Sequence, residues 1–308
     1  MARKKETDVT HVLSTKTAIG KEDKRFYFAV NLILGLLVIT VLFPIINVLA
    51  CSFSSGDAIV SGKVLLWPVE VTLENYKAVF KEQDILTGYV NTIFYTVVGT
   101  TINIVMTLLA AYPLSRRNLA GKNGIMMLFA FTMLFNGGLI PNYLLMKSLH
   151  ILNTRWVMVL PGAIAVYNMV ICRTFFATSL PEELWEAAQV DGCTDFKYFL
   201  KVALPLSKAV IAVIGLYYAV AHWNAYFNAF LYLNKSSLYP LQIVLKEILI
   251  SNTVDPNTIL DADSASSLNL VEGLKYACIL VACVPVWCIY PFIQKYFVQG
   301  VMIGAIKG

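Results

Sequence analysis

Charged residues are scarce in this sequence. Only 14% of its 308 residues are Asp, Glu, Lys or Arg, whereas a soluble globular domain carries about 25%. Hydrophobic residues make up 58% of the chain, and they are gathered in blocks rather than scattered. This composition excludes an ordinary soluble protein, and the net charge of +5 gives no reason to expect a nucleic-acid partner.

The sequence also lacks the motifs of several kinds of chemistry. It has no G-x-x-x-x-G-K-[ST] phosphate loop, so we do not expect it to bind ATP in that manner. Its six cysteines follow no metal-ligand spacing. The last three, Cys278, Cys283 and Cys288, are five residues apart, and such steps turn about 140° along a helix, so they share no face. We therefore expect no metal site, no disulfide and no enzyme activity in this chain.

Long apolar runs are what the sequence has instead. A bilayer core requires roughly 20 consecutive apolar helical residues, and a helix satisfies its own backbone hydrogen bonds there. We expect an all-α membrane protein in which residues 1–26 form a polar cytoplasmic arm and residues 27–308 form one transmembrane domain. Six spans are predicted, at about 27–50, 89–112, 125–147, 156–176, 209–231 and 276–298.

The first span has an alternative interpretation. Residues 48–51, "VLAC", resemble a lipoprotein cleavage box. However, the polar region before the run and the run itself are both longer than those of a signal peptide, and the run is long enough to span. We favour a transmembrane helix.

Basic residues indicate the orientation. If the amino terminus is cytoplasmic, fourteen Lys and Arg fall in the cytoplasmic segments and seven in the outer ones, although the outer loops are longer. This excess follows the positive-inside rule. We predict that both termini are cytoplasmic.

The loops contain further signals. In the outer segments, residues 72–80 and the stretch "YPLQIVLKEILI" (239–250) each predict an amphipathic helix. Within the third span, "NGGLIP" (136–141) predicts a break, which a membrane tolerates only where protein or water satisfies the backbone.

A polar block between the fourth and fifth spans, residues 177–208, is long for a connection. Ser179 is the predicted cap of a helix that reaches about Val190, Asp191-Gly192 predicts a turn, and a second helix is predicted over 194–203. Its apolar side would comprise Phe196, Phe199, Leu200 and Ala203. The block is either a surface hairpin that joins two spans or a docking element for another protein.

The residues of this block resemble a known family. "EAAQVDGCTDFKYFLKVALPLSK" (186–208) is similar to the EAA loop of permease subunits of type I ABC importers, in the MalG-like carbohydrate branch. Four more stretches resemble the LplC/YtcP-like oligosaccharide permeases: "AYPLSR" (111–116), "NGGLIPNYLL" (136–145), "LNTRWVMVLP" (152–161) and "GAIKG" (304–308). Cys193 departs from the pattern, because alanine is commoner there, but a small volume is kept.

The resemblance implies a MetI-like/MalG-like permease fold and a role in a bacterial cell membrane. The chain would form half of the translocation path for oligosaccharides. Its expected partners are a second MalF-like permease, two ATP-binding subunits that hold ATP and Mg, and an extracellular substrate-binding lipoprotein docked on 51–88 and 232–274. The residues that would couple the chain to the ATPase are Glu186, Ala187, Ala188, Asp191, Gly192, Leu204 and Pro205, and the carboxyl-terminal tail would reach the ATPase through Gly304, Lys307 and Gly308.

The fifth predicted span is the richest in polar and aromatic residues. In "YYAVAHWNAYFNAF" (217–230), Asn224 and Asn228 are spaced to share a helix face, with Tyr226 and Phe227 beside them. Amides suit sugar hydroxyls and aromatic rings suit sugar C–H surfaces, so these four residues are candidates for the substrate path. Alternatively, the amides bond between helices, as we expect of Asn91, Asn103, Asn136 and Asn168.

Two rival functions predict features that the sequence lacks. A secondary transporter would carry paired ionisable residues at mid-membrane and an internal repeat. An intramembrane enzyme would gather catalytic residues near one membrane face, whereas the three histidines, His11, His150 and His222, lie far apart without acidic partners in sequence. Neither rival explains the long polar block.

Overall fold

The computed structural model describes residues 20–251 and 262–305, and within these ranges all of the regular structure is helical. Most of the amino-terminal arm (1–19) and the last residues (306–308) lie outside the described residues. The α-helices are α1 (Lys21–Ser52), α2 (Gly56–Val60), α3 (Glu74–Lys81), α4 (Gln83–Ser115), α5 (Lys122–Leu134), α6 (Leu139–Ser148), α7 (Trp156–Val159), α8 (Val166–Ser179), α9 (Glu182–Val190), α10 (Asp195–Tyr198), α11 (Leu204–Leu206), α12 (Lys208–Trp223), α13 (Phe227–Tyr232), α14 (Leu241–Ser251) and α15 (Ala262–Ala305). A π-helix, η2 (Phe199–Ala203), and a 3₁₀ turn, η3 (Ser236–Leu238), complete the order.

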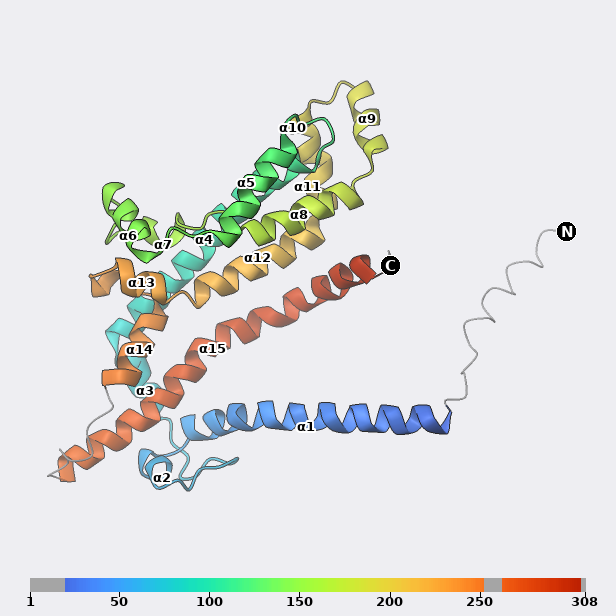
Figure 1. Cartoon of the computed structure of the whole chain (residues 1–308). Helices are drawn as coiled ribbons and strands as arrows, with labels where there is room; N and C mark the ends of the chain where they lie inside the picture. The colour runs from blue at the N-terminus through green and yellow to red at the C-terminus, as the bar shows by residue number, and fades with distance from the viewer. Residues whose placement is uncertain (1–19, 252–261, 306–308) are drawn as a thin grey trace.

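Helix α4 is the centre of the packing, with α8, α12 and α14 around it (Figure 1). Two of its glycines permit this close approach. A β-carbon on Gly88 would lie 3.1 Å from the Leu241 backbone at the start of α14, and one on Gly99 would overlap the ring of His222 on α12. Small residues at such positions let helix backbones pack closely in a membrane.

Amide side chains of α4 bind backbone carbonyls that lie between other helices. Nδ2 of Asn91 donates to the carbonyls of Ser237 and Tyr239, at 2.9 and 3.1 Å. Nδ2 of Asn103 donates to those of Gly162 and Ala163, at 2.9 and 3.0 Å. These carbonyls belong to the short 3₁₀ turn η3 and to the loops beside it and at 162–163, so the amides satisfy groups that apolar surroundings would leave unpaired. The predicted bonds between helices are confirmed for Asn91 and Asn103.

The other two amides differ. The hydrogen bonds of Asn136 are local. Its Oδ1 accepts from the backbone nitrogen of Gly138 at 2.9 Å and from Nδ2 of Asn142 at 3.4 Å. The prediction of a bond between separate spans is therefore wrong for Asn136. Asn168 is buried on α8.

Three helical segments are long and apolar enough to cross a membrane: Asp23–Ser52, Gln83–Ser115 and Val271–Pro291. Two bent pairs, Lys122–Leu134 with Leu139–Ser148 (114°) and Asp195–Leu206 with Lys208–Trp223 (81°), would raise the number among the described residues to five if each pair counts as one span. The predicted break at 136–141 is confirmed, since Gly138 has φ +90° between α5 and α6. The count of six spans stays a prediction.

The region predicted as the fourth span is not one continuous helix. Residues 156–176 divide into the short α7 and the later α8, because Pro161 and Gly162 lie between them and Gly162 has φ +75°. A proline without an N–H and a glycine in the left-handed region together end a helix. The chain bends there, and the exposed carbonyls are the ones that Asn103 binds.

Helix α1 stands apart from the central bundle and packs on α15 (Figure 1). Its apolar side chains are exposed all round through most of its length. A helix that is hydrophobic on every side is stable only when lipid or protein covers it.

Candidate functional site

The first half of the polar block folds as predicted. Glu182 and Glu183 occupy the first turn of α9, where carboxylates favour the positive end of the helix dipole. The helix ends at Val190, and Gly192 follows with φ +71°. Its nitrogen donates to the carbonyl of Gln189 at 2.9 Å, so the predicted Asp191-Gly192 turn is confirmed. The predicted cap is wrong, because Pro181 rather than Ser179 precedes the helix and no side chain caps it.

Helix α9 has two different faces. Trp185 and Ala188 pack against the core of this chain, and Nε1 of Trp185 donates to Oδ1 of Asp195 at 3.0 Å. The opposite face is exposed and combines carboxylates with apolar side chains, at a spacing that aligns them along the helix: Glu183, Glu186, Ala187 and Val190. Val190 is 88% exposed. This face has the mixed apolar and charged character of a protein contact surface.

The second half of the block is less regular than predicted. Thr194 caps α10, and its Oγ1 accepts from the backbone nitrogen of Lys197. The chain then widens into the π-helix η2 before Pro205, which has no N–H to continue an α-helical ladder. This change of winding alters the apolar side, so Phe196 and Leu200 are exposed whereas Phe199 and Ala203 are buried. Of the four residues predicted to share one side, only Phe199 and Ala203 are buried.

Buried residues connect the block to the bundle. Tyr198, Phe199 and Ala203 belong to one apolar cluster with residues of α4, α8 and α12; from these helices the cluster includes Ala111, Tyr112, Cys172, Phe176, Val210 and Ile214. The rings of Phe199 and Tyr112 are 4.8 Å apart. We call this group the inner cluster. The inner cluster therefore packs the block directly against all three helices.

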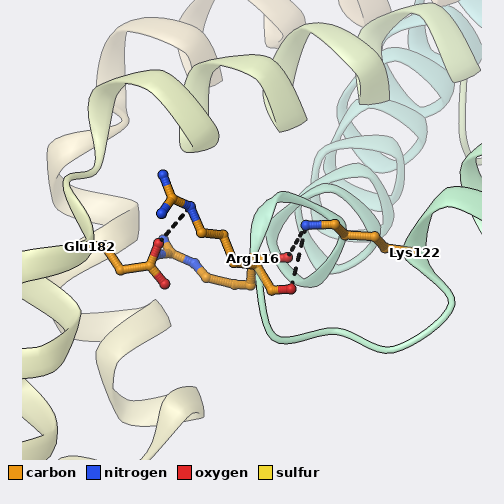
Figure 2. Close-up of polar contacts among 4 residues, drawn as sticks. Arg116, Lys122 and Glu182 are labelled. Atoms are coloured by element: carbon orange, nitrogen blue, oxygen red, sulfur yellow. Dashed lines mark hydrogen bonds and ion pairs between the residues drawn. The ribbon is translucent and has the colours of Figure 1, made fainter.

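The turn after α4 is a second connection. Nε of Arg117 lies 3.2 Å from a carboxylate oxygen of Glu182 on α9, and Nζ of Lys122 donates to the carbonyls of Arg116 and Arg117 (Figure 2). The Arg116 guanidinium lies over the rings of Tyr112 and Tyr198, 4.7 and 5.6 Å from their centroids. The end of α4 is thus joined to both helices of the block.

A second candidate site is a cavity of about 580 Å³ at the other end of α12. It is lined by aromatic, amide, aliphatic and basic side chains from α12, α14, α15 and the break after α12: Trp223, Asn224, Tyr226, Gln242, Leu245, Lys246, Leu249, Ile279, Ala282, Cys283, Val286 and Trp287. Few polar groups in an apolar wall are typical of small-molecule sites.

The cavity includes only part of the predicted substrate path. Asn224 and Tyr226 line it, whereas Phe227 and Asn228 do not and are exposed. The predicted shared face of Asn224 and Asn228 is wrong, because α12 ends at Trp223 and a new helix begins at Phe227. Nδ2 of Asn224 donates back to the carbonyl of Val220 at 2.9 Å, which closes the helix end. This local bond competes with helix continuation.

Sequence reasoning missed most of this lining, including Gln242, Lys246 and Trp287. Gln242 and Lys246 are four residues apart on the predicted amphipathic helix, and that spacing was the available signal. Trp287 lies on α15, in an apolar run where the sequence does not distinguish a cavity residue from a lipid-facing or packed one.

The other predicted site residues lie elsewhere. In the block, Asp191 and Pro205 are exposed and Leu204 packs against the inner cluster. In the tail, Gly304 falls in the last turn of α15, whereas Lys307 and Gly308 lie outside the described residues. Arg173 donates from Nε to the carbonyl of Leu114 at 3.1 Å, so it joins α8 to α4.

These features define an all-helical membrane protein of the permease class, with a polar block at one end of the bundle and a cavity at the other. The chain belongs to the family of binding-protein-dependent transport system inner membrane components, whose sequence profile matches residues 23–303. Its members are permease subunits of ABC transporters and are not themselves enzymes.

Individual relatives agree with the family. The chain is 41% identical over 265 residues to the polygalacturonan/rhamnogalacturonan transport system permease protein YtcP of Bacillus subtilis. This match covers 86% of this chain and 92% of YtcP. It is also 41% identical over 275 residues to protein LplC of the same organism, covering 89% and 92%.

A solved structure shares the fold. A bacterial ABC transporter involved in the import of the acidic polysaccharide alginate contains a chain that matches with a TM-score of 0.82 and 33% identity. The match covers 90% of this chain and 98% of that one. The type I ABC permease fold expected from the sequence is confirmed.

Proposed function

We propose that this chain is one of two permease subunits of an ATP-driven importer of oligosaccharides, and that residues 177–208 couple it to a separate ATPase. The observation that carries this proposal is the two-faced helix α9. One face presents Glu186, Ala187 and Val190 to the outside, while the other is tied through Trp185 to the block's second helix. A loop that only joined two spans would have no use for an exposed face of this kind.

The proposed motion follows from the packing. ATP binding closes the ATPase pair, and the closing subunit moves α9 together with α10. The inner cluster passes this displacement to α4, α8 and α12, and the ion pair between Arg117 and Glu182 adds a direct link to the end of α4. The 81° bend before Lys208 converts a displacement along the membrane surface into a tilt of α12. The transporter thus alternates between inward-facing and outward-facing states as a rigid-body switch.

The proposed assembly has the composition that the family resemblance implies. It contains a MalF-like second permease, two ATP-binding subunits that hold ATP and Mg, and a substrate-binding lipoprotein that docks on residues 51–88 and 232–274. The exposed apolar surface of α1 supports contact with lipid or with the second permease. Both chain termini and the 177–208 block would face the cytoplasm of a bacterial cell, where Gly304, Lys307 and Gly308 would reach the ATPases.

The substrate class rests on the cavity and on the relatives. The amide side chains of the cavity wall suit sugar hydroxyls, and Trp223, Tyr226 and Trp287 offer rings to sugar C–H surfaces. YtcP is named for polygalacturonan and rhamnogalacturonan transport, and the structural relative for import of alginate. We propose a saccharide substrate of more than one residue for this chain as well.

The test is Glu186→Ala in the complete complex, reconstituted in proteoliposomes with its binding protein. We expect ATPase stimulation by the loaded binding protein and sugar import to fall severalfold, since the exposed carboxylate contacts only the partner. Lys24→Gln is the matched control, because it removes an exposed charge at the start of α1. Unchanged import and stimulation in the Glu186 variant would show that α9 is a connector only.

A further inference from the structure

Lys246 is the one charged residue among the described residues that line the cavity. It lies on α14, half-buried, one helical turn beyond Gln242. Its ammonium group lies 4.1 Å from the centroid of the Phe230 ring and 5.6 Å from that of Tyr226. The side chain is therefore held against aromatic faces at the cavity rather than extended into solvent.

These rings hold the charge without neutralising it. A ring face attracts a cation through its quadrupole, but it carries no formal negative charge. The rest of the described lining is apolar or neutral, so it supplies no carboxylate to the ammonium group. A positive charge in a wall of low polarity attracts an anion more strongly than the same charge would in water.

The cavity also offers groups that a carboxylated sugar needs besides a cation. The amides of Asn224 and Gln242 lie on its wall, and Nδ2 of Asn224 donates to the carbonyl of Val220. The indole of Trp223 is fixed because its Nε1 donates to the carbonyl of Ala282 at 3.2 Å, and Trp287 lies on the same helix as Ala282. Fixed aromatic faces lower the entropy cost of ordering a ligand.

We propose that this cavity binds an acidic saccharide and that Lys246 pairs with the carboxylate of one of its sugar units. The inference rests on the proposed function and narrows its substrate class to uronic-acid oligosaccharides. Lys246 is then a specificity-determining residue, whereas Tyr226 and Phe230 position its ammonium group. The structural relative, which takes part in import of an acidic polysaccharide, is consistent with this class.

The experiment compares two probes of equal length, a trigalacturonate and its fully methyl-esterified form, in the reconstituted complex supplied with its binding protein. Import and stimulated ATPase activity are measured for wild type, Lys246→Gln, Lys246→Arg and the control Lys24→Gln, which alters an exposed lysine outside both the cavity and the proposed docking segments. Because a hydrogen bond to a charged group contributes more than a neutral one, we expect Lys246→Gln to lower trigalacturonate import roughly tenfold or more. Import should return with Lys246→Arg and remain at the wild-type level in the control.

Three results with the variants would overturn the inference. These are wild-type trigalacturonate import by Lys246→Gln, an equal loss with both probes, and a failure of Lys246→Arg to restore import where Lys246→Gln loses it. The last two would assign Lys246 a packing role rather than charge recognition. If the wild-type complex instead imported neutral oligosaccharides but neither acidic probe nor alginate oligomers, the acidic class alone would fail. If it imported no saccharide at all, the proposed function itself would fail.

Discussion

Gly99 of α4 lies directly against the imidazole of His222 on α12, whose Nε2 is 2.6 Å from Oδ1 of Asn103. A β-carbon at position 99 would lie closer than 3.0 Å to three atoms of that ring. The glycine therefore creates the space in which a half-buried histidine and a buried amide hold α4, α12 and the 162–163 turn together.

The first prediction follows from this contact. Gly99→Ala should displace the imidazole, break its hydrogen bond to Asn103 and lower the stability of the complex by about 1–3 kcal/mol, the usual range for overpacking. Thermal unfolding in detergent, followed by near-ultraviolet circular dichroism, measures the change. Gly35→Ala on α1 is the control, because no atom lies within 4 Å of its β-carbon position. Equal melting temperatures for the two variants would contradict the close contact.

A second prediction concerns Tyr218. Its hydroxyl lies 2.7 Å from Oγ1 of Thr107 and accepts from the backbone nitrogen of Ala165 at 3.0 Å. Tyr218→Phe leaves these two groups unpaired in a buried place, so it should destabilise the protein by about 1–3 kcal/mol. Tyr167→Phe, at a ring that is 64% exposed, should have little effect. The difference in melting temperature between the two variants checks this, and a difference near zero would rule out the Tyr218 bonds.

The turn glycines permit a third prediction. Gly192 and Gly121 have similar backbone angles, φ +71° and +75°, and neither has an atom within 4 Å of its β-carbon position. Alanine at either position should cost about 1 kcal/mol of backbone strain. Only Gly192→Ala should also reduce import per ATP hydrolysed, because only that turn borders the proposed docking face. If Gly121→Ala uncoupled the transporter equally, backbone strain alone would explain both effects.

The fourth prediction is that the ion pair between Arg117 and Glu182 contributes little to the stability of the protein. The Arg117 side chain is 83% exposed and that of Glu182 is 31% exposed, so solvent screens their attraction. Arg117→Ala should change stability by less than about 1 kcal/mol. Chemical denaturation of the purified complex would detect a larger loss, which would mean that a partner subunit buries the pair.

Sequence patterns predicted those features that depend on neighbouring residues. The helices α3, α9 and α14, the turn at Gly192 and the break at Gly138 all follow from local propensity and periodicity, and the structure has each of them. The end of α12 could not be predicted in this way. No proline or glycine stands in "HWNAYF" (222–227), and the helix stops because the Asn224 side chain closes its own turn.

The cavity shows a different limit. Its wall combines Asn224, Lys246 and Trp287, which lie on three segments separated by many residues. Periodicity along one helix ranked Asn228 with Asn224 and gave Lys246 no role. Only the packing of α14 with α15, and of α15 with the end of α12 through the bond from Trp223 to the Ala282 carbonyl, brings the cation to the amide and the rings.

Helix α1 packs on α15, the last long helix of the chain. Roughly 200 residues separate the two, and at about 5–20 residues per second the ribosome needs roughly 10–40 seconds to deliver them. Throughout that interval α1, which has apolar side chains on every side, lacks its packing partner α15. Synthesis of this chain therefore includes a period in which lipid or another protein must cover α1 in place of α15.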